Sequence, residues 1–367
     1  MRGWPFMRLR RGSGYRWQTD LIRSIQYLRA VAALTVVWVH ARYVIPGIGE
    51  QLGEPYFGGS GVDLFFVISG FIMVVTTARD DLTPQKFFLL RVIRVVPLYW
   101  VATLALVACE AAGGCAPFET SSRDPYPPMA IAKSLLFVPF SWLGDAKGLW
   151  PILANGWTLN YEMFFYALFA LSLAAPRRVR LPALGLTLGS LVVIGRVFGP
   201  FATPLASFYS SPLLLEFVAG MILAHGWLRD GWRSGLPLSL FVIVFGFYCM
   251  GSLHSRPIIM GGAFLVVSGC LNPRICAIQN RPLLELGNAS YSIYLIHQFV
   301  LEALAWSWTR VFPRITWVSS AFFVASALVL CAVVGCLCYR FIEQPMTSQL
   351  RKLLKKSGGY LRSQTSS

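Results

Sequence analysis

The sequence predicts an all-α protein, a polytopic integral membrane protein of about ten transmembrane helices with both termini in the cytoplasm. Hydrophobic residues make up 56% of the 367 residues and charged residues only 13%, whereas soluble domains carry about 25% charged residues. The apolar residues gather in long runs, and most basic residues lie between those runs. The net charge of +16 is therefore better explained by membrane topology than by nucleic-acid binding, which is not expected.

Ten apolar runs have the composition of membrane-spanning helices. A span needs about 20 predominantly apolar residues, within a range of about 17 to 25. Nine of the runs fall in that range, and the run at 258–271 is shorter. In chain order the predicted spans are 25–44, 61–78, 88–109, 156–175, 181–199, 212–228, 236–253, 258–271, 289–308 and 317–341.

The orientation follows from the basic residues between these spans. If the N-terminal arm is cytoplasmic, 22 Lys and Arg residues in the termini, the loops and the ends of the spans fall on its side and 7 fall on the opposite side. Cytoplasmic loops of membrane proteins carry such an excess of positive charge. Every loop on the cytoplasmic side contributes to the excess, so the pattern supports the number of spans as well as their direction.

A single transmembrane domain, 25–345, is predicted between a basic arm, 1–24, and a basic tail, 346–367. The longest connection, 110–155, is extracytoplasmic in this topology and rich in Pro, Gly and aromatic residues. A loop of that length is usually functional or disordered. Cys109 and Cys115 could pair there on an oxidising face, although nothing in the sequence requires it.

The first span carries two ionisable residues, Arg29 and His40. They are eleven residues apart, which places them on one helix face and about 16 Å apart along the axis. Ionisable residues inside spans are costly and usually functional. A histidine near mid-bilayer suits general-base catalysis because it titrates near neutral pH. The alternative is structural, with Arg29 reaching to the membrane surface and His40 bonded to a neighbour.

Arg91 and Arg94 open the third span and share a helix face at i, i+3. Paired guanidinium groups suit the binding of phosphates. With Arg29 on a neighbouring helix they would form one cytoplasmic phosphate site. The alternative is that both arginines only anchor the cytoplasmic end of the span.

Two acidic residues and a second histidine complete the candidates. Asp63 begins the second span, where a carboxylate is also favoured by the helix dipole. Glu162 lies about two turns inside the fourth span, and an intramembrane glutamate indicates function more strongly than an ion-pair partner alone. His297 forms one polar stripe with Ser290 and Tyr294 at i, i+4 and i+7. That stripe is equally explained by function and by interhelical hydrogen bonding.

Six segments in this order resemble the acyltransferase-3 family of membrane O-acyltransferases, and within it the exopolysaccharide-production branch. One of them alone would be weak evidence, whereas six in family order on a ten-span frame are specific to the family. They do not specify the substrate. The segments are 28–34 leading to His40, 61–71, 91–100, 157–162, 290–295 with His297, and 341–345.

The resemblance implies that the protein transfers an acyl group, in the first place acetyl, from cytoplasmic acyl-CoA to a hydroxyl of an exopolysaccharide or other cell-surface glycan. It implies acyl-CoA as donor substrate, held through its phosphates by Arg29, Arg91 and Arg94, and no metal cofactor. It also implies a multi-pass protein of the bacterial inner membrane. Its partners would be the lipid bilayer, the glycan acceptor and polysaccharide-assembly proteins.

Two functions compete on these residues. In an O-acyltransferase, His40 would deprotonate the acceptor hydroxyl or form an acyl-histidine intermediate. Glu162 or Asp63 would orient the histidine or bind sugar hydroxyls, and His297 would contribute a smaller effect. In a transporter or flippase, the same polar groups would form a proton relay. Such proteins are often built from repeated halves, and no repeat is visible here.

Overall fold

The computed structural model describes residues 14–52, 60–78, 82–111, 126–140, 149–201, 203–231, 235–252 and 255–364. Within these ranges all regular structure is helical, so the predicted all-α class is confirmed. In chain order the helices are α1 (Gly14–Ala41), α2 (Ile48–Leu52), α3 (Ser60–Thr77), α4 (Pro84–Ala111), α5 (Pro128–Leu135), α6 (Gly156–Ser172), α7 (Arg177–Phe198), α8 (Pro204–Tyr209), α9 (Leu214–Asp230), α10 (Leu236–Ser252), α11 (Arg256–Cys270), α12 (Pro273–Cys276), α13 (Arg281–Asn288), α14 (Ser290–Val311), α15 (Trp317–Cys338), the π-helix η1 (Tyr339–Glu343) and α16 (Gln344–Gln364).

Each of the ten predicted spans coincides with one of these helices, namely α1, α3, α4, α6, α7, α9, α10, α11, α14 and α15. Five stretches of the described chain are both long and apolar enough to cross a membrane. They are Ser60–Thr77, Pro84–Ala111, Arg177–Phe198, Pro204–Asp230 and Trp317–Leu354. The helices α10 and α11 are apolar but shorter. Ten crossings and two cytoplasmic termini therefore remain predictions, as do the predicted domain boundaries.

The chain divides into two compact units built from interleaved segments. Unit 1 comprises Met1–Val39, Glu54–Asp80 and Leu215–Ser290, and unit 2 comprises His40–Gly53, Asp81–Leu214 and Tyr291–Ser367. Cys109, at the end of α4 in unit 2, is disulfide-bonded. Its predicted partner, Cys115, lies outside the described residues.

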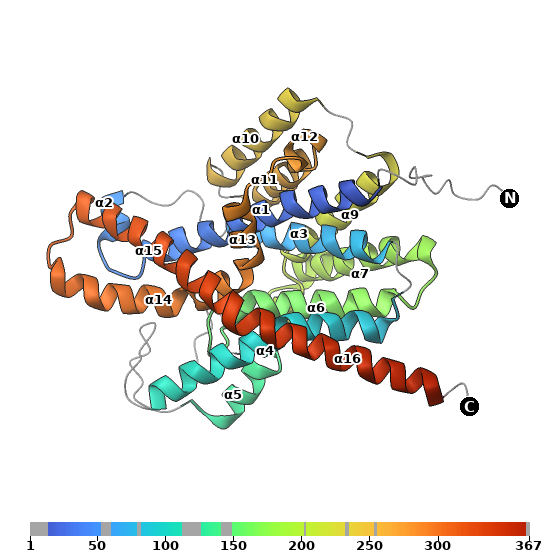
Figure 1. Cartoon of the computed structure of the whole chain (residues 1–367), viewed down its shortest axis with the longest axis horizontal. Coiled ribbons are helices and arrows are strands. Elements are labelled where there is room, and N and C mark those ends of the chain that lie inside the picture. The colour runs from blue at the N-terminus through green and yellow to red at the C-terminus, as the bar shows by residue number, and fades with distance from the viewer. Residues whose placement is uncertain are drawn as a thin grey trace. The chain divides into compact units, whose positions relative to one another are not determined.

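In unit 1, glycines let α3 and α9 pack backbone against backbone. A Cβ on Gly220 would lie 2.0 Å from the carbonyl oxygen of Val67, and a Cβ on Gly70 would lie 2.1 Å from that of Phe217. Only glycine allows such an approach, which is a common device of helix pairs in membranes. This packing brings the first turns of α3 and α9 together. The pair α10 and α11 lies side by side in the same unit (Figure 1).

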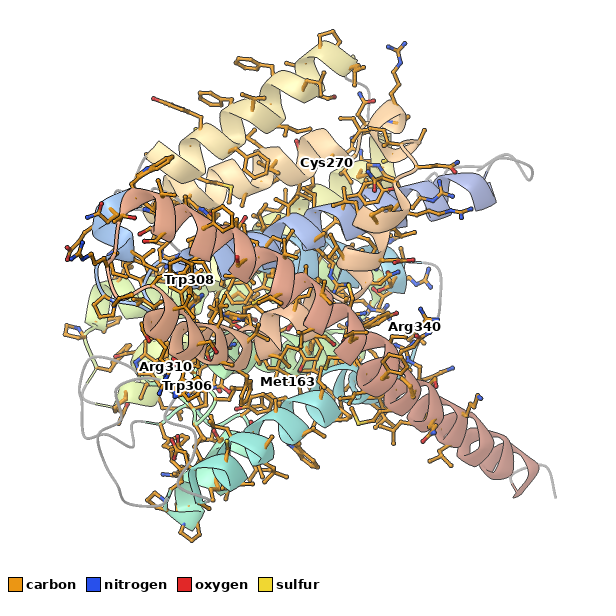
Figure 2. The ribbon with its side chains drawn as sticks, turned by 60° about the vertical axis from the view of Figure 1, so that its left-hand side comes forward. Met163, Cys270, Trp306, Trp308, Arg310 and Arg340 are labelled. Carbon is orange, nitrogen blue, oxygen red and sulfur yellow. The ribbon has the colours of Figure 1, made fainter. Side chains whose placement is uncertain are left out.

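In unit 2, the aromatic faces of α4 and α6 pack together, with the rings of Phe87 and Phe169 stacked at 5.1 Å between centroids. Helix α15 continues through η1 into α16, so that the three form one long rod (Figure 1). Arg340 lies on this rod at the π-helical turn (Figure 2). Near the end of α14, the guanidinium of Arg310 lies 3.5 Å above the ring of Trp306 (Figure 2).

Candidate functional site

Two imidazole rings meet in unit 2. His40 lies near the end of α1 and His297 in the second turn of α14, and their ring centroids are 4.9 Å apart with the planes tilted by 55°. His297 is completely buried, whereas His40 is half-buried. A substrate would therefore reach His40 more easily than His297.

The hydrogen bonds of His297 define its tautomer. Its Nδ1 lies 2.7 Å from the carbonyl oxygen of Tyr294. A carbonyl can only accept, so Nδ1 carries the proton and donates it. The other nitrogen, Nε2, is then an acceptor with a free lone pair. It is buried and has no hydrogen-bond partner within the described part of the chain.

A second set of hydrogen bonds holds Tyr294, the residue that anchors His297. The Tyr294 hydroxyl donates to the carbonyl oxygen of Asn155 at 3.0 Å and lies 2.6 Å from Oγ1 of Thr158. Thr158 in turn donates to the same Asn155 carbonyl at 3.1 Å. The start of α6 is thereby fixed to the turn of α14 that carries His297, and the buried ring is held in one orientation.

The acid of α6 and the arginines of α4 form a second cluster in unit 2. The hydroxyl of Tyr166 donates to the carboxylate of Glu162. The guanidinium of Arg91 lies 5.4 Å from the ring centroid of Phe87 and 5.9 Å from that of Tyr166. The charges of Glu162, Arg94 and Arg351 all act on Arg91. The cluster is therefore net positive, and it includes a basic residue of the C-terminal helix α16.

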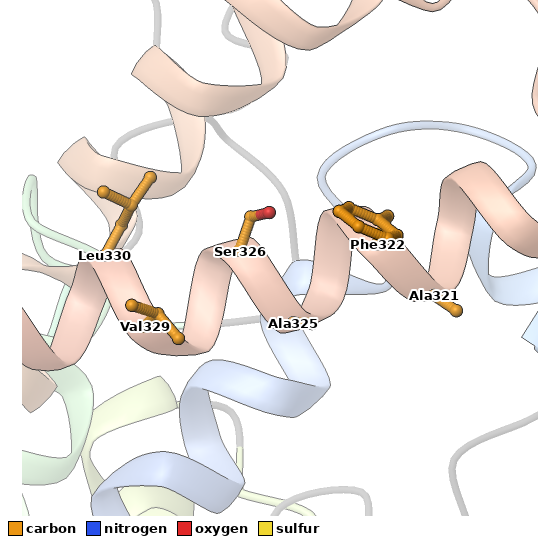
Figure 3. Close-up of a pocket in the computed structure, with 6 residues that line it drawn as sticks. All are labelled: Ala321, Phe322, Ala325, Ser326, Val329 and Leu330. Atoms are coloured by element: carbon orange, nitrogen blue, oxygen red, sulfur yellow. The ribbon is translucent and has the colours of Figure 1, made fainter.

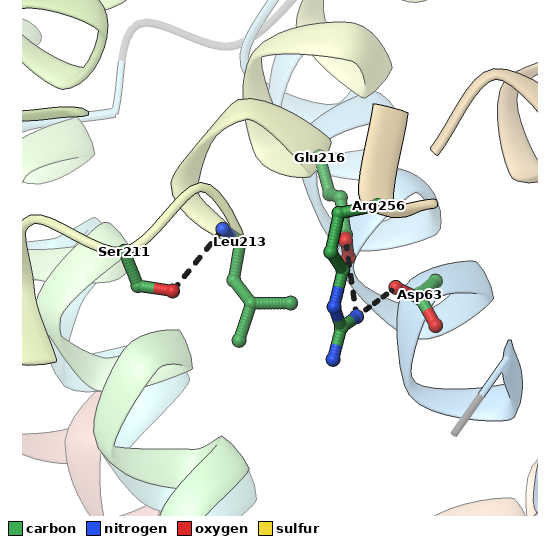
Figure 4. Close-up of polar contacts among 5 residues, drawn as sticks. All are labelled: Asp63, Ser211, Leu213, Glu216 and Arg256. Carbon is green, nitrogen blue, oxygen red and sulfur yellow. Dashed lines mark hydrogen bonds and ion pairs between the residues drawn. The ribbon is translucent and has the colours of Figure 1, made fainter. Parts of the chain in front are cut away.

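An ion triad lies at three helix starts in unit 1 (Figure 4). Arg256 Nη1 is 2.8 Å from Asp63 Oδ1 and 4.0 Å from Glu216 Oε1. Both carboxylate side chains are 2% exposed, whereas the arginine side chain is 51% exposed. Two buried acids thus share one half-exposed cation. Their positions in the first turns of α3 and α9 suit the positive ends of those helix dipoles.

Glu343 ends η1 and is buried in unit 2. Its Oε2 accepts a hydrogen bond of 2.6 Å from the hydroxyl of Ser292 on α14. The hydroxyl of the preceding residue, Tyr291, donates to the carbonyl oxygen of Val95 at 2.7 Å. These bonds join α14 to η1 and to α4, so Glu343 has an anchoring role.

The surface hollow along α15 does not suit acyl-transfer chemistry. Six residues of this one helix line it, and the only polar group among them is the hydroxyl of Ser326 (Figure 3). An apolar face of a long apolar helix is what contact with lipid requires. The hollow therefore offers no acid, base or phosphate-binding group.

The comparison with known proteins settles the family. The profile of the acyltransferase domain called acyltransferase-3 matches residues 22–339, nearly the whole chain. The chain belongs to the acyltransferase-3 family. It is 34% identical over 311 residues to the exopolysaccharide production protein ExoZ of Rhizobium meliloti, an alignment that covers 81% of this chain and 92% of ExoZ.

Peptidoglycan O-acetyltransferases are more distant acyltransferase-3 relatives. The putative enzyme YrhL of Bacillus subtilis is 25% identical over 89% of this chain, and OatA of Listeria monocytogenes is 23% identical over 90%. The alignments span 55% and 56% of those longer proteins. No solved structure matches the chain. The family membership makes the protein an acyltransferase and favours that hypothesis over a transporter or flippase.

The structure brings some of the predicted site residues together and gives others different partners. His40 meets His297, and Arg91 shares a cluster with Arg94 and Glu162. Asp63 instead pairs with Arg256 in unit 1. Arg29 also belongs to unit 1, where its Nη1 donates to Gln26 at 3.1 Å.

Several residues of these clusters were not predicted as site residues, among them Glu216, Arg256 and Asn155. Glu216 lies within the predicted span 212–228, so the rule that intramembrane acids are functional would have found it. In the predicted topology, Arg256 is one of the 7 basic residues on the side opposite the N-terminal arm, and no other role is predicted for it. Asn155 lies two residues before the 157–162 motif, but no single residue pattern marks a buried asparagine as important.

Proposed function

We propose that this acyltransferase moves an acyl group, in the first place acetyl, from acyl-CoA to a hydroxyl of an exopolysaccharide or other cell-surface glycan in the bacterial inner membrane. The observation that carries the proposal is the pair of imidazoles, half-buried His40 beside buried His297. The similarity to ExoZ, an exopolysaccharide production protein, supports the acceptor class.

The chemistry follows from what each group can do. A sugar hydroxyl is a weak nucleophile at neutral pH, so a base must take its proton as it attacks. We assign this role to His40. The hydroxyl oxygen forms a bond to the thioester carbonyl carbon, the carbon–sulfur bond then breaks, and the proton held by the imidazole passes to the departing sulfur. His297 is the buried partner that limits how the ring of His40 can turn.

The proposed activity is tested in the host strain and with purified protein. Deleting the gene should remove one acyl mass from the surface glycan, as measured by mass spectrometry, and the plasmid-borne gene should restore it. Purified protein with acetyl-CoA and the deacylated glycan should release free CoA thiol in a glycan-dependent manner. An unchanged set of acyl masses in the deletion strain would contradict the proposed acceptor.

Arg91 and Arg94 are proposed to bind the phosphates of the donor. Changing Arg91→Ala should weaken acetyl-CoA binding by about tenfold or more, since a hydrogen bond to a charged group contributes about 1.5–3 kcal/mol. Equilibrium binding of acetyl-CoA to the purified variant measures this effect. The matched control is Arg178→Ala at the start of α7, an exposed arginine of the same predicted membrane side. Unchanged affinity in a folded Arg91→Ala, Arg94→Ala double variant would leave only the topological role.

A further inference from the structure

Asn155 links the start of α6 to the histidine-bearing turn of α14. It is the N-cap residue of α6 and is 3% exposed. Its Nδ2 donates to the carbonyl oxygens of Tyr294 at 3.0 Å and Leu295 at 3.3 Å. The Tyr294 carbonyl is the same oxygen that accepts from Nδ1 of His297 at 2.7 Å. Asn155 and His297 therefore lie on either side of one carbonyl oxygen.

These bonds fix the orientation of the Asn155 amide. Both partners of its nitrogen are carbonyls, which only accept, so the nitrogen and oxygen cannot be exchanged. The backbone of Asn155 is also held, because its carbonyl accepts from Tyr294 and Thr158. The amide oxygen, Oδ1, consequently has one fixed direction.

This arrangement leaves two buried acceptor atoms without a hydrogen-bond partner. Oδ1 of Asn155 and Nε2 of His297 are both buried, and neither has a hydrogen-bond partner among the residues that the structure describes. Leaving a buried acceptor unsatisfied costs free energy, so such atoms in a native protein call for an explanation. Both atoms belong to side chains that donate to the Tyr294 carbonyl oxygen, and the His297 ring lies 4.9 Å from that of His40, so a ligand that donates hydrogen bonds beside His40 would satisfy them.

We propose that Asn155 is a specificity-determining residue whose Oδ1 accepts a hydrogen bond from the sugar hydroxyl adjacent to the one that is acylated. The inference rests on the proposed function and names the feature of the acceptor that the site recognises, a pair of neighbouring hydroxyls. A sugar supplies both groups from adjacent ring carbons, the hydroxyl that loses its proton to His40 and the neighbouring hydroxyl that donates to Oδ1. The amide N–H groups of the acyl-CoA arm are the other source of such donors, and the test separates the two.

The test compares wild type and Asn155→Ala with acetyl-CoA and a set of acceptors: methyl glucopyranoside, galactopyranoside and mannopyranoside, and their monodeoxy analogues. With the wild type, removing the adjacent hydroxyl should lower kcat/KM for transfer by about three- to tenfold, the effect of one hydrogen bond. With Asn155→Ala, the parent and that deoxy acceptor should react equally, because the interaction is already lost. Asn155→Ser provides a second variant that keeps a favoured helix N-cap but lacks Oδ1.

The matched control is Asn272→Ala. Asn272 is a buried N-cap asparagine in unit 1 whose Nδ2 donates to Ser239 at 2.9 Å. This variant should keep the wild-type ratio between parent and deoxy acceptors. Three results would overturn the proposal: an equal deoxy effect in wild type and Asn155 variants, a raised KM for acetyl-CoA alone, or refusal of every pyranoside by a wild type that acylates the host glycan. Each differs from failure of the proposed function, in which the host glycan loses no acyl mass on gene deletion.

Discussion

Changing His40→Ala is expected to abolish acyl transfer, with a loss on the order of 10²–10⁴-fold, the usual contribution of a general base. His40 is the accessible member of the histidine pair, so its ring is the one that can reach the acceptor hydroxyl. The measurement is acylated glycan per unit of folded membrane protein. His225→Ala is the matched control, since His225 lies exposed on α9 in unit 1.

The same assay with His297→Ala should give a smaller reduction. This side chain is completely buried and bonded to its own helix, so it acts on the substrate less directly than His40. Substantial product from His40→Ala would remove that residue from the catalytic role. Loss of product only in His297→Ala would move the base to α14.

The positions of the helices could be predicted because each depends on a local property of the sequence. A run of apolar residues bounded by basic loops is recognisable without tertiary information. The ends were less accurate: α1 starts at Gly14 rather than at residue 25, so the basic arm is partly helical. The predicted last span ends at residue 341, whereas the helix that begins with α15 continues through η1 into α16.

The partners of the site residues could not be predicted in the same way. The apposition of His40 and His297 is a tertiary contact between residues far apart in the chain, and no spacing in the sequence encodes it. The same holds for Asn155 and Tyr294. For Asp63, the position at a helix start suggested either a dipole role or a catalytic one, and neither suggestion points to its observed partner Arg256, which is distant in the sequence.

The ion pair between Arg256 and Asp63 leads to an expectation about the stability of the protein. Changing Arg256→Ala should leave Asp63 and Glu216 as two buried carboxylates without their shared cation. Removing one partner of a fully buried ion pair costs about 3–5 kcal/mol. Because the Arg256 side chain is 51% exposed, water already screens part of the interaction, and a loss of about 1–3 kcal/mol is expected instead.

The loss would be measured as a lower apparent Tm of the purified protein in detergent. Arg310→Ala is the control, since Arg310 contacts only the ring and carbonyl of Trp306 in its own helix among its described partners. If the instability comes from uncompensated charge, the double variant Asp63→Asn, Arg256→Ala should be more stable than Arg256→Ala alone, because one of the two negative charges is gone. Equal Tm values for wild type and Arg256→Ala would mean that the two acids do not need the guanidinium. In that case they must share a proton, since two adjacent ionised carboxylates cannot remain buried without a cation.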